Sequence, residues 1–208
     1  MLSVIVKKPS MTTDSRGSMV RSAASLIRSR GVSATSLADV LADSGAPRGS
    51  IYHHFPAGKR QLAEDAIQWT SERLLAHLRA GAPSSPSAVL ERFIDIWRRT
   101  VVASAGTAGC VVAGVAIDTV PDESGLIELV RATFRSWAAL LAEQLETAGV
   151  PTRRAKPIAM ATLAGMEGAL ILCRAEGNVK PLDAVAEELM RLLPPEKPGR
   201  RKRPVHSS

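Results

Sequence analysis

The sequence predicts an all-α protein of about nine helices, divided into an N-terminal helix-turn-helix domain and a larger C-terminal helical domain. Three observations support this fold class. Apolar residues recur every three or four positions along most of the chain, alanine and leucine are abundant, and glycine and proline separate the periodic segments. Apolar residues make up 45% of the 208 residues and charged residues 23%, which is ordinary for a globular protein with a sizeable core.

Residues 15–60 are expected to form the three helices of the helix-turn-helix domain. The preceding segment, residues 1–14, has no apolar periodicity, and we expect it to be disordered. Apolar residues at helical spacing continue as far as Gly31, which ends the first helix. Thr35 is a favourable N-cap for the second helix.

A short turn joins the second and third helices, which is the arrangement of a DNA-binding helix-turn-helix. Gly45 supplies the positive φ that the turn needs, and Pro47 suits the first position of the third helix. No acidic residue lies between Ser44 and Gly58, and Lys59 then opens the next helix, where a cation opposes the helix dipole and suits a phosphate. The third helix would project polar groups toward phosphates and base edges. The candidate DNA contacts are Thr35, Ser36, Arg48, Gly49, Ser50, Tyr52, His53 and Lys59.

Residues 61–193 are expected to hold the other six helices, and residues 194–208 a disordered basic tail. The segments with helical character are Leu62–Leu78, Pro86–Ala105, Val111–Thr119, Pro121–Thr147, Pro157–Arg174 and Leu182–Leu193. By periodicity alone Val111–Thr119 could be a strand, but the lack of a partner strand favours a buried short helix. Pro157–Arg174 is apolar on nearly every face, which suits either the central helix of a monomer or a dimer interface.

Positive charge is concentrated at the two ends of the chain. Residues 1–60 carry nine lysines and arginines against three aspartates, and residues 191–208 carry six against one glutamate. The region between them holds twelve basic and sixteen acidic residues. Such asymmetry favours a polyanionic partner such as nucleic acid, although a solvated surface with a disordered tail would give the same pattern.

Several function classes are excluded or disfavoured by composition. Two cysteines, without metal-ligand spacing, give neither a disulfide scaffold nor a zinc site. The adjacent His53 and His54 point in different directions on a helix and have no accompanying carboxylate or cysteine, so we expect no metal and no cofactor. No histidine lies in a catalytic context, so we expect no enzyme activity. With no signal peptide and no uncharged apolar run of about 18 residues, we expect a cytoplasmic protein outside the membrane.

The stretch from Thr35 to Leu62, TSLADVLADSGAPRGSIYHHFPAGKRQL, resembles the DNA-binding motif of TetR/AcrR transcriptional regulators. It departs from the usual motif in one extra residue between Phe55 and Lys59, and in Pro47, where a serine is common. The later segment GCVVAGVAID, residues 109–118, resembles the LmrA/YxaF-like branch of that family, although Val111 replaces the proline typical of the branch.

The resemblance implies a homodimer that forms through the last two long helices and binds a palindromic operator. It also implies a small lipophilic effector, bound in the C-terminal domain, that releases a repressor from DNA. Two other interpretations of the residues stay open. The protein could be a nucleoid-type DNA-binding protein without an effector, or a membrane-surface protein that uses its basic ends.

The effector site is harder to predict than the DNA-binding surface. Glu167 is a carboxylate within an apolar run, which a cationic lipophile or one of Arg98, Arg99 and Arg174 could neutralise. Cys110 could be a redox sensor or a small buried apolar residue. The inward-facing tryptophans could line a pocket or belong to the core. The candidate ligand-binding residues are Trp97, Cys110, Asp118, Trp137, Met160, Met166 and Glu167.

Overall fold

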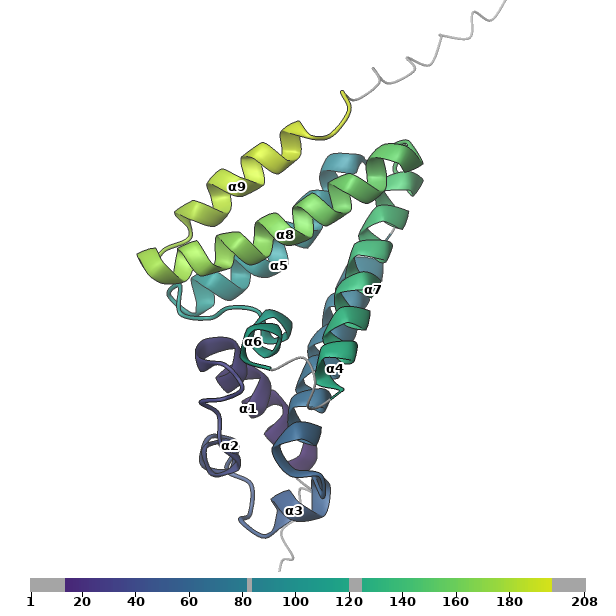
Figure 1. Ribbon diagram of the computed structural model, residues 1–208. Helices are drawn as coiled ribbons and strands as arrows, with labels where there is room; N and C mark the ends of the chain where they lie inside the picture. The colour runs from purple at the N-terminus through teal and green to yellow at the C-terminus, as the bar shows by residue number, and fades with distance from the viewer. Residues whose placement is uncertain (1–13, 82–83, 120–124, 196–208) are drawn as a thin grey trace, which may run out of the picture.

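The computed structural model describes residues 14–81, 84–119 and 125–195, and these residues form nine α-helices and no β-strand (Figure 1). The all-α prediction is therefore confirmed. The expected disorder of residues 1–13 and of the tail from residue 196 lies outside the described residues. The helices are α1 Ser15–Arg30, α2 Leu37–Ser44, α3 Ser50–His54, α4 Gly58–Arg79, α5 Pro86–Ala103, α6 Val111–Asp118, α7 Leu126–Thr147, α8 Thr152–Glu176 and α9 Lys180–Arg191.

The helices form two groups joined by long helices (Figure 1). The helix-turn-helix elements α1, α2 and α3 lie at one end, and α5, α8 and α9 lie at the other. Helices α4 and α7 pack side by side and span the distance between the two groups. The short helix α6 contacts α1, α4 and α7, so it connects the helix-turn-helix end with the two long helices.

The helix ends near the turn correct two expectations. Ser36, and not Thr35, caps α2: its hydroxyl accepts the Asp39 N–H, and the Asp39 carboxylate accepts the Ser36 N–H in return. Thr35 is only 4% exposed, because its hydroxyl turns back and donates to the Gly31 carbonyl at 2.7 Å. Gly45 has the expected positive φ, 67°, and ends α2.

Three other boundaries differ from the predicted ones. Asp14 is part of the ordered structure, because its carboxylate accepts the Gly17 N–H and caps α1. Pro47 lies in the turn, and α3 begins three residues later at Ser50. Helix α8 begins at Thr152 and contains Pro157 in its second turn, where the proline has no N–H to donate to the Arg153 carbonyl. The predicted start of α7 at Pro121 lies outside the described residues.

The C-terminal core is built around α8 and a cluster of aromatic rings. Trp137 is fully buried, with ring centroids 6.1 Å from Trp97 and 5.7 Å from Phe134. Helix α8 contacts α5, α7 and α9. Its length and its mean hydropathy of 1.5 over 18 residues would also suffice to cross a membrane. Its packing among three helices buries 44% of these 18 residues, so only one side of α8 belongs to the protein core.

Candidate functional site

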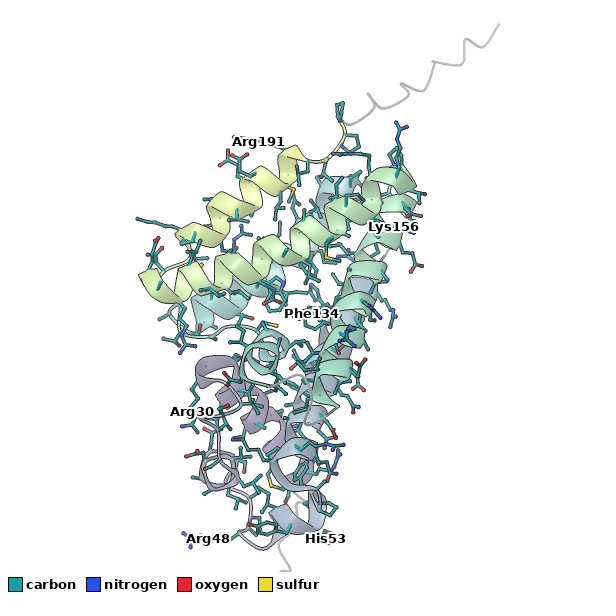
Figure 2. All side chains as sticks on the ribbon, viewed as in Figure 1. Arg30, Arg48, His53, Phe134, Lys156 and Arg191 are labelled. Carbon is teal, nitrogen blue, oxygen red and sulfur yellow. The ribbon has the colours of Figure 1, made fainter. Side chains whose placement is uncertain are left out.

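The third helix forms a projecting surface at one end of the molecule. Ile51 and Phe55 are buried and fix α3 against the rest of the helix-turn-helix. The intervening Tyr52 is 69% exposed, and His53 and Arg48 are also exposed. Figure 2 shows Arg48 and His53 at this end, far from Lys156 at the other. The alternation of buried and exposed residues leaves a polar face that contains Arg48 and no acidic residue free for a partner.

The other candidate DNA contacts differ in exposure. Thr35 is buried, so its side chain is not part of this face. Ser36 is exposed, but its hydroxyl also contacts the Asp39 carboxylate at 2.7 Å. Ser50 is half-buried and donates to the Pro47 carbonyl at 2.6 Å. Gly49 is exposed, and a Cβ there would meet no protein atom within 4 Å, so the space above it is open.

Lys59 has a structural contact that the sequence did not suggest. Its Nζ donates to the Ser33 carbonyl at 2.9 Å, which ties the start of α4 to the loop between α1 and α2. The ammonium keeps two further N–H groups. A phosphate could therefore bind Lys59 without breaking this contact.

The loop after α1 packs directly against α6. The Ser33 N–H donates to Asp118 Oδ2 at 3.1 Å, and the Gly109 N–H donates to the Arg28 carbonyl at 2.8 Å. Gly31 has φ 83°, and a side chain at this position would collide with the Asp118 carboxylate. Asp118 was a candidate ligand residue, but it is exposed and binds this loop because α6 ends beside it.

We expect Asp118→Ala to loosen this contact without disturbing the core. Loss of one partly exposed hydrogen bond costs about 1 kcal/mol, so exchange of the Ser33 amide hydrogen should accelerate about fivefold. Hydrogen exchange followed by NMR measures this directly. Asp118→Asn keeps an acceptor oxygen and should restore most of the protection. Unchanged exchange in Asp118→Ala would show that the contact does not form in solution.

A first cavity of about 290 Å³ lies between α1, α4 and α5. Trp97 lines it, and its Nε1 is buried without a hydrogen-bond partner in the described part of the chain. Arg28 reaches the cavity from α1, and Arg99 and Thr100 from α5. Helix α4 contributes Trp69, Thr70, Arg73, Leu74 and His77.

A second cavity of about 370 Å³ lies between α1, α6 and α8, and its lining includes Cys110, Phe134 and Glu167. Burial raises the pKa of the Glu167 carboxyl to about 7, although the nearby Cys110 thiol lowers it. Glu167 Oε1 has no hydrogen-bond partner among the described residues. Burial, reinforced by the Glu167 charge, holds the pKa of the Cys110 thiol well above its usual range. A thiol held protonated is a poor redox sensor.

The arginines suggested for Glu167 have different positions. Arg98 binds Asp183 at 2.8 Å, and Arg99 pairs with Asp95 on its own helix. Arg174 lines the same cavity as Glu167 without contacting Oε1.

Three further candidates line neither cavity. Trp137 and Met166 are fully buried core residues. Met160 is 55% exposed, on a face of α8 that none of the described residues covers.

Sequence reasoning missed the basic and aromatic residues of the first cavity. Trp69, Arg73 and His77 are spaced four apart, so they share one face of α4 beside its buried stripe. That spacing was a usable signal. Arg28 carried no such signal, because its surroundings come from α4, α5 and the loop before α6.

Comparisons with known sequences agree with this architecture. Residues 20–66 match the family described as bacterial regulatory proteins of the tetR family. Residues 86–188 match the LmrA/YxaF-like transcriptional regulator C-terminal domain. An uncharacterized HTH-type transcriptional regulator of Mycobacterium tuberculosis is 36% identical over 89% of this chain and 97% of its own length. The regulator LmrA of Bacillus subtilis is 29% identical over 81% of this chain and 91% of LmrA.

Solved structures show the same fold. The regulatory protein TetR from Rhodobacter sphaeroides superimposes with a TM-score of 0.77 and 20% identity, covering 86% of this chain and 99% of that one. A TetR regulator from Chloroflexus aurantiacus gives 0.69 at 28% identity, covering 85% and 92%. The TetR family regulator CifR, solved with a 26-bp double-strand operator DNA, gives 0.70 at 18% identity, covering 86% and 96%.

Proposed function

The chain belongs to the TetR family of bacterial transcriptional regulators, and from this premise we propose that it is a homodimeric cytoplasmic repressor released from a palindromic operator by a small lipophilic molecule. In this proposal residues 15–60 bind DNA, and residues 61–193 bind the effector and the second subunit. The observation that carries the DNA-binding role is the projecting face of α3, where exposed Tyr52 and Arg48 flank the anchored Ile51.

The proposed dimer is supported by an apolar surface on α8. Met160, Ile171 and Leu172 are each more than half exposed, although α8 is otherwise a core helix. Exposed apolar side chains on one long helix suit burial against a second copy. Two copies would present two α3 helices to successive major grooves, as a palindromic operator requires.

Effector control is supported by the contacts between the two groups of helices. Asp118 of α6 accepts the Ser33 N–H from the loop after α1, and Gly109, in the loop before α6, donates to the Arg28 carbonyl of α1. Both cavities adjoin α1. A ligand that favours one position of these helices would change the spacing of the two α3 helices and therefore the DNA affinity.

We expect Arg48→Ala and Tyr52→Ala each to weaken binding to a specific duplex by about 1–3 kcal/mol, or about 5- to 150-fold. Both side chains are exposed, so thermal unfolding should not change. The specific duplex is first selected from a randomised pool with the wild-type protein, and fluorescence anisotropy then compares it with a scrambled duplex at two salt concentrations. Lys156→Ala, at the other end of the molecule, is the matched control (Figure 2).

Lys59→Ala should weaken binding to both duplexes by the same factor and lower the slope of log affinity against log salt concentration by roughly one unit, because a phosphate contact carries no sequence information.

The same binding measurements decide between the candidate functions. Equal affinity of wild type and Arg48→Ala for the selected duplex would contradict the role of α3. Uniform binding to both duplexes would favour a nucleoid-type protein. Absence of DNA binding would favour a membrane-surface protein.

A further inference from the structure

We propose that the first cavity selects a small planar aromatic anion, whose negative group binds Arg28 and Arg73 while its rings lie against Trp69 and Trp97. This inference deepens the proposed function and rests on it, since it names the chemical class of the effector. The sequence led us to expect a lipophilic effector, and the cavity adds that this effector carries a negative charge.

The charges around the cavity have one sign. Arg28, Arg73 and Arg99 line it, and no aspartate or glutamate does among the residues with a described position. Arg99 is already paired with Asp95, but Arg28 and Arg73 form no salt bridge within the residues that the structure describes. Two unpaired guanidiniums around one small cavity repel a cation and favour an anion.

Arg28 is the stronger anchor of the two. Its Nε is buried and has no hydrogen-bond partner in the described parts of the chain. Burial lowers the pKa of the Arg28 guanidinium, and the positive charge of Arg73 lowers it further, whereas Cys110 opposes the shift. A guanidinium stays charged in proteins. An anionic group bound here would accept the Arg28 Nε–H and would also offset the repulsion between Arg28 and Arg73.

Two indoles supply the surfaces for an aromatic ring. The Arg73 guanidinium lies over the Trp69 ring, 4.9 Å from its centroid. Trp97 is 4% exposed, yet it lines the cavity with an unpartnered Nε1–H that could donate to a ligand oxygen. The volume of about 290 Å³ is near the lower limit for small-molecule sites, which suits a compact planar ligand.

The position of Arg28 couples this ligand to the DNA-binding helices. Arg28 belongs to α1, and its carbonyl accepts the Gly109 N–H from the loop that precedes α6. An anion bound to its guanidinium would therefore act on α1 directly, without an intervening helix. Ligand charge, and not only ligand volume, should determine DNA release.

Three ligands with one ring system test the charge preference. Calorimetry measures the binding of 2-naphthoate, 2-naphthamide and 2-naphthylmethylammonium, which are anionic, neutral and cationic. We expect 2-naphthoate to bind about tenfold or more tighter than 2-naphthamide, and the ammonium to bind most weakly.

Variants then assign the preference to the cavity. Arg28→Met and Arg73→Met keep apolar volume and leave no carboxylate unpaired, so the protein should still fold. Each should remove most of the advantage of 2-naphthoate while changing 2-naphthamide affinity by less than about twofold. Arg79→Met is the matched control, because Arg79 is an exposed arginine of the same helix that does not line the cavity. It should behave as wild type. Circular dichroism confirms the fold of each variant.

The outcomes separate this inference from the proposed function. Equal affinities, tightest binding of the ammonium, no binding of any ligand, or an unchanged preference in Arg28→Met would overturn the anion-selective cavity. A neutral or cationic ligand that releases the selected duplex would still leave effector control intact. Conversely, charge-dependent binding of 2-naphthoate without release of the duplex would support the cavity assignment and contradict effector control.

Discussion

Trp137→Ala is expected to lower the free energy of unfolding by about 3–5 kcal/mol, the range for large aromatic deletions in a core. Trp137 is fully buried, and its ring packs against Trp97 and Phe134. Its Nε1 donates to Ser71 Oγ at 3.0 Å and so joins α7 to α4. The substitution removes the apolar contacts and this hydrogen bond together.

Chemical denaturation at a fixed protomer concentration measures the loss, since the stability of a dimer depends on concentration. Trp137→Phe keeps most of the ring and should cost much less. Neither variant should alter 2-naphthoate affinity by much while the protein stays folded, because Trp137 does not line the first cavity. Trp97→Phe should lower the affinity for 2-naphthoate, because Trp97 lines this cavity. A ligand affinity that fell with Trp137→Phe and not with Trp97→Phe would show that the assignment of the two tryptophans is wrong.

Glu167→Gln is expected to stabilise the protein above neutral pH and to flatten its pH dependence. Burial raises the pKa of Glu167 from its ordinary value of 4.5 to about 7, so the folded state binds this proton more tightly than the unfolded state. The protonated Glu167 therefore makes its full contribution to the free energy of unfolding below about pH 4.5. This contribution is lost as the pH rises to about 7. A shift of this size corresponds to roughly 3 kcal/mol.

Glutamine resembles the protonated acid, so the variant should match wild type near pH 5 and exceed it by up to about 3 kcal/mol at pH 8. Denaturation curves at several pH values measure the difference. Glu143→Gln removes an exposed carboxylate from α7 and serves as the control, with little expected change. Parallel pH profiles for wild type and Glu167→Gln would contradict a buried, readily protonated carboxyl.

The two cavities differ in the polar groups that line them. The first is lined by arginines and indoles, whereas the second is mainly apolar and holds Glu167 with Arg28 and Arg174. Arg28 lines both cavities and belongs to α1. A ligand in either cavity would therefore lie against the first helix of the helix-turn-helix.

The helix-turn-helix and the order of the helices could be predicted from the sequence, because they depend on local signals. Gly45 adopts the positive φ that its turn requires, and Ile51 and Phe55 are buried while Tyr52 projects. Capping is less certain from sequence, since Thr35 and Ser36 are both good caps. Tertiary packing decided between them by turning the Thr35 hydroxyl toward Gly31.

The residues that meet at the cavities, and at the contact between α1 and α6, could not be predicted from local signals. Arg28, Trp69 and Trp97 come from three helices, and no periodicity within one helix indicates that they face the same space. Asp118 and Ser33 are 85 positions apart, yet they share a hydrogen bond. Trp137 lies in the core and Trp97 lines a cavity, but the sequence places both on the inward face of a helix and does not distinguish these two positions. The physical reason is that local spacing fixes the face on which a side chain lies, whereas packing between distant helices fixes what that face meets.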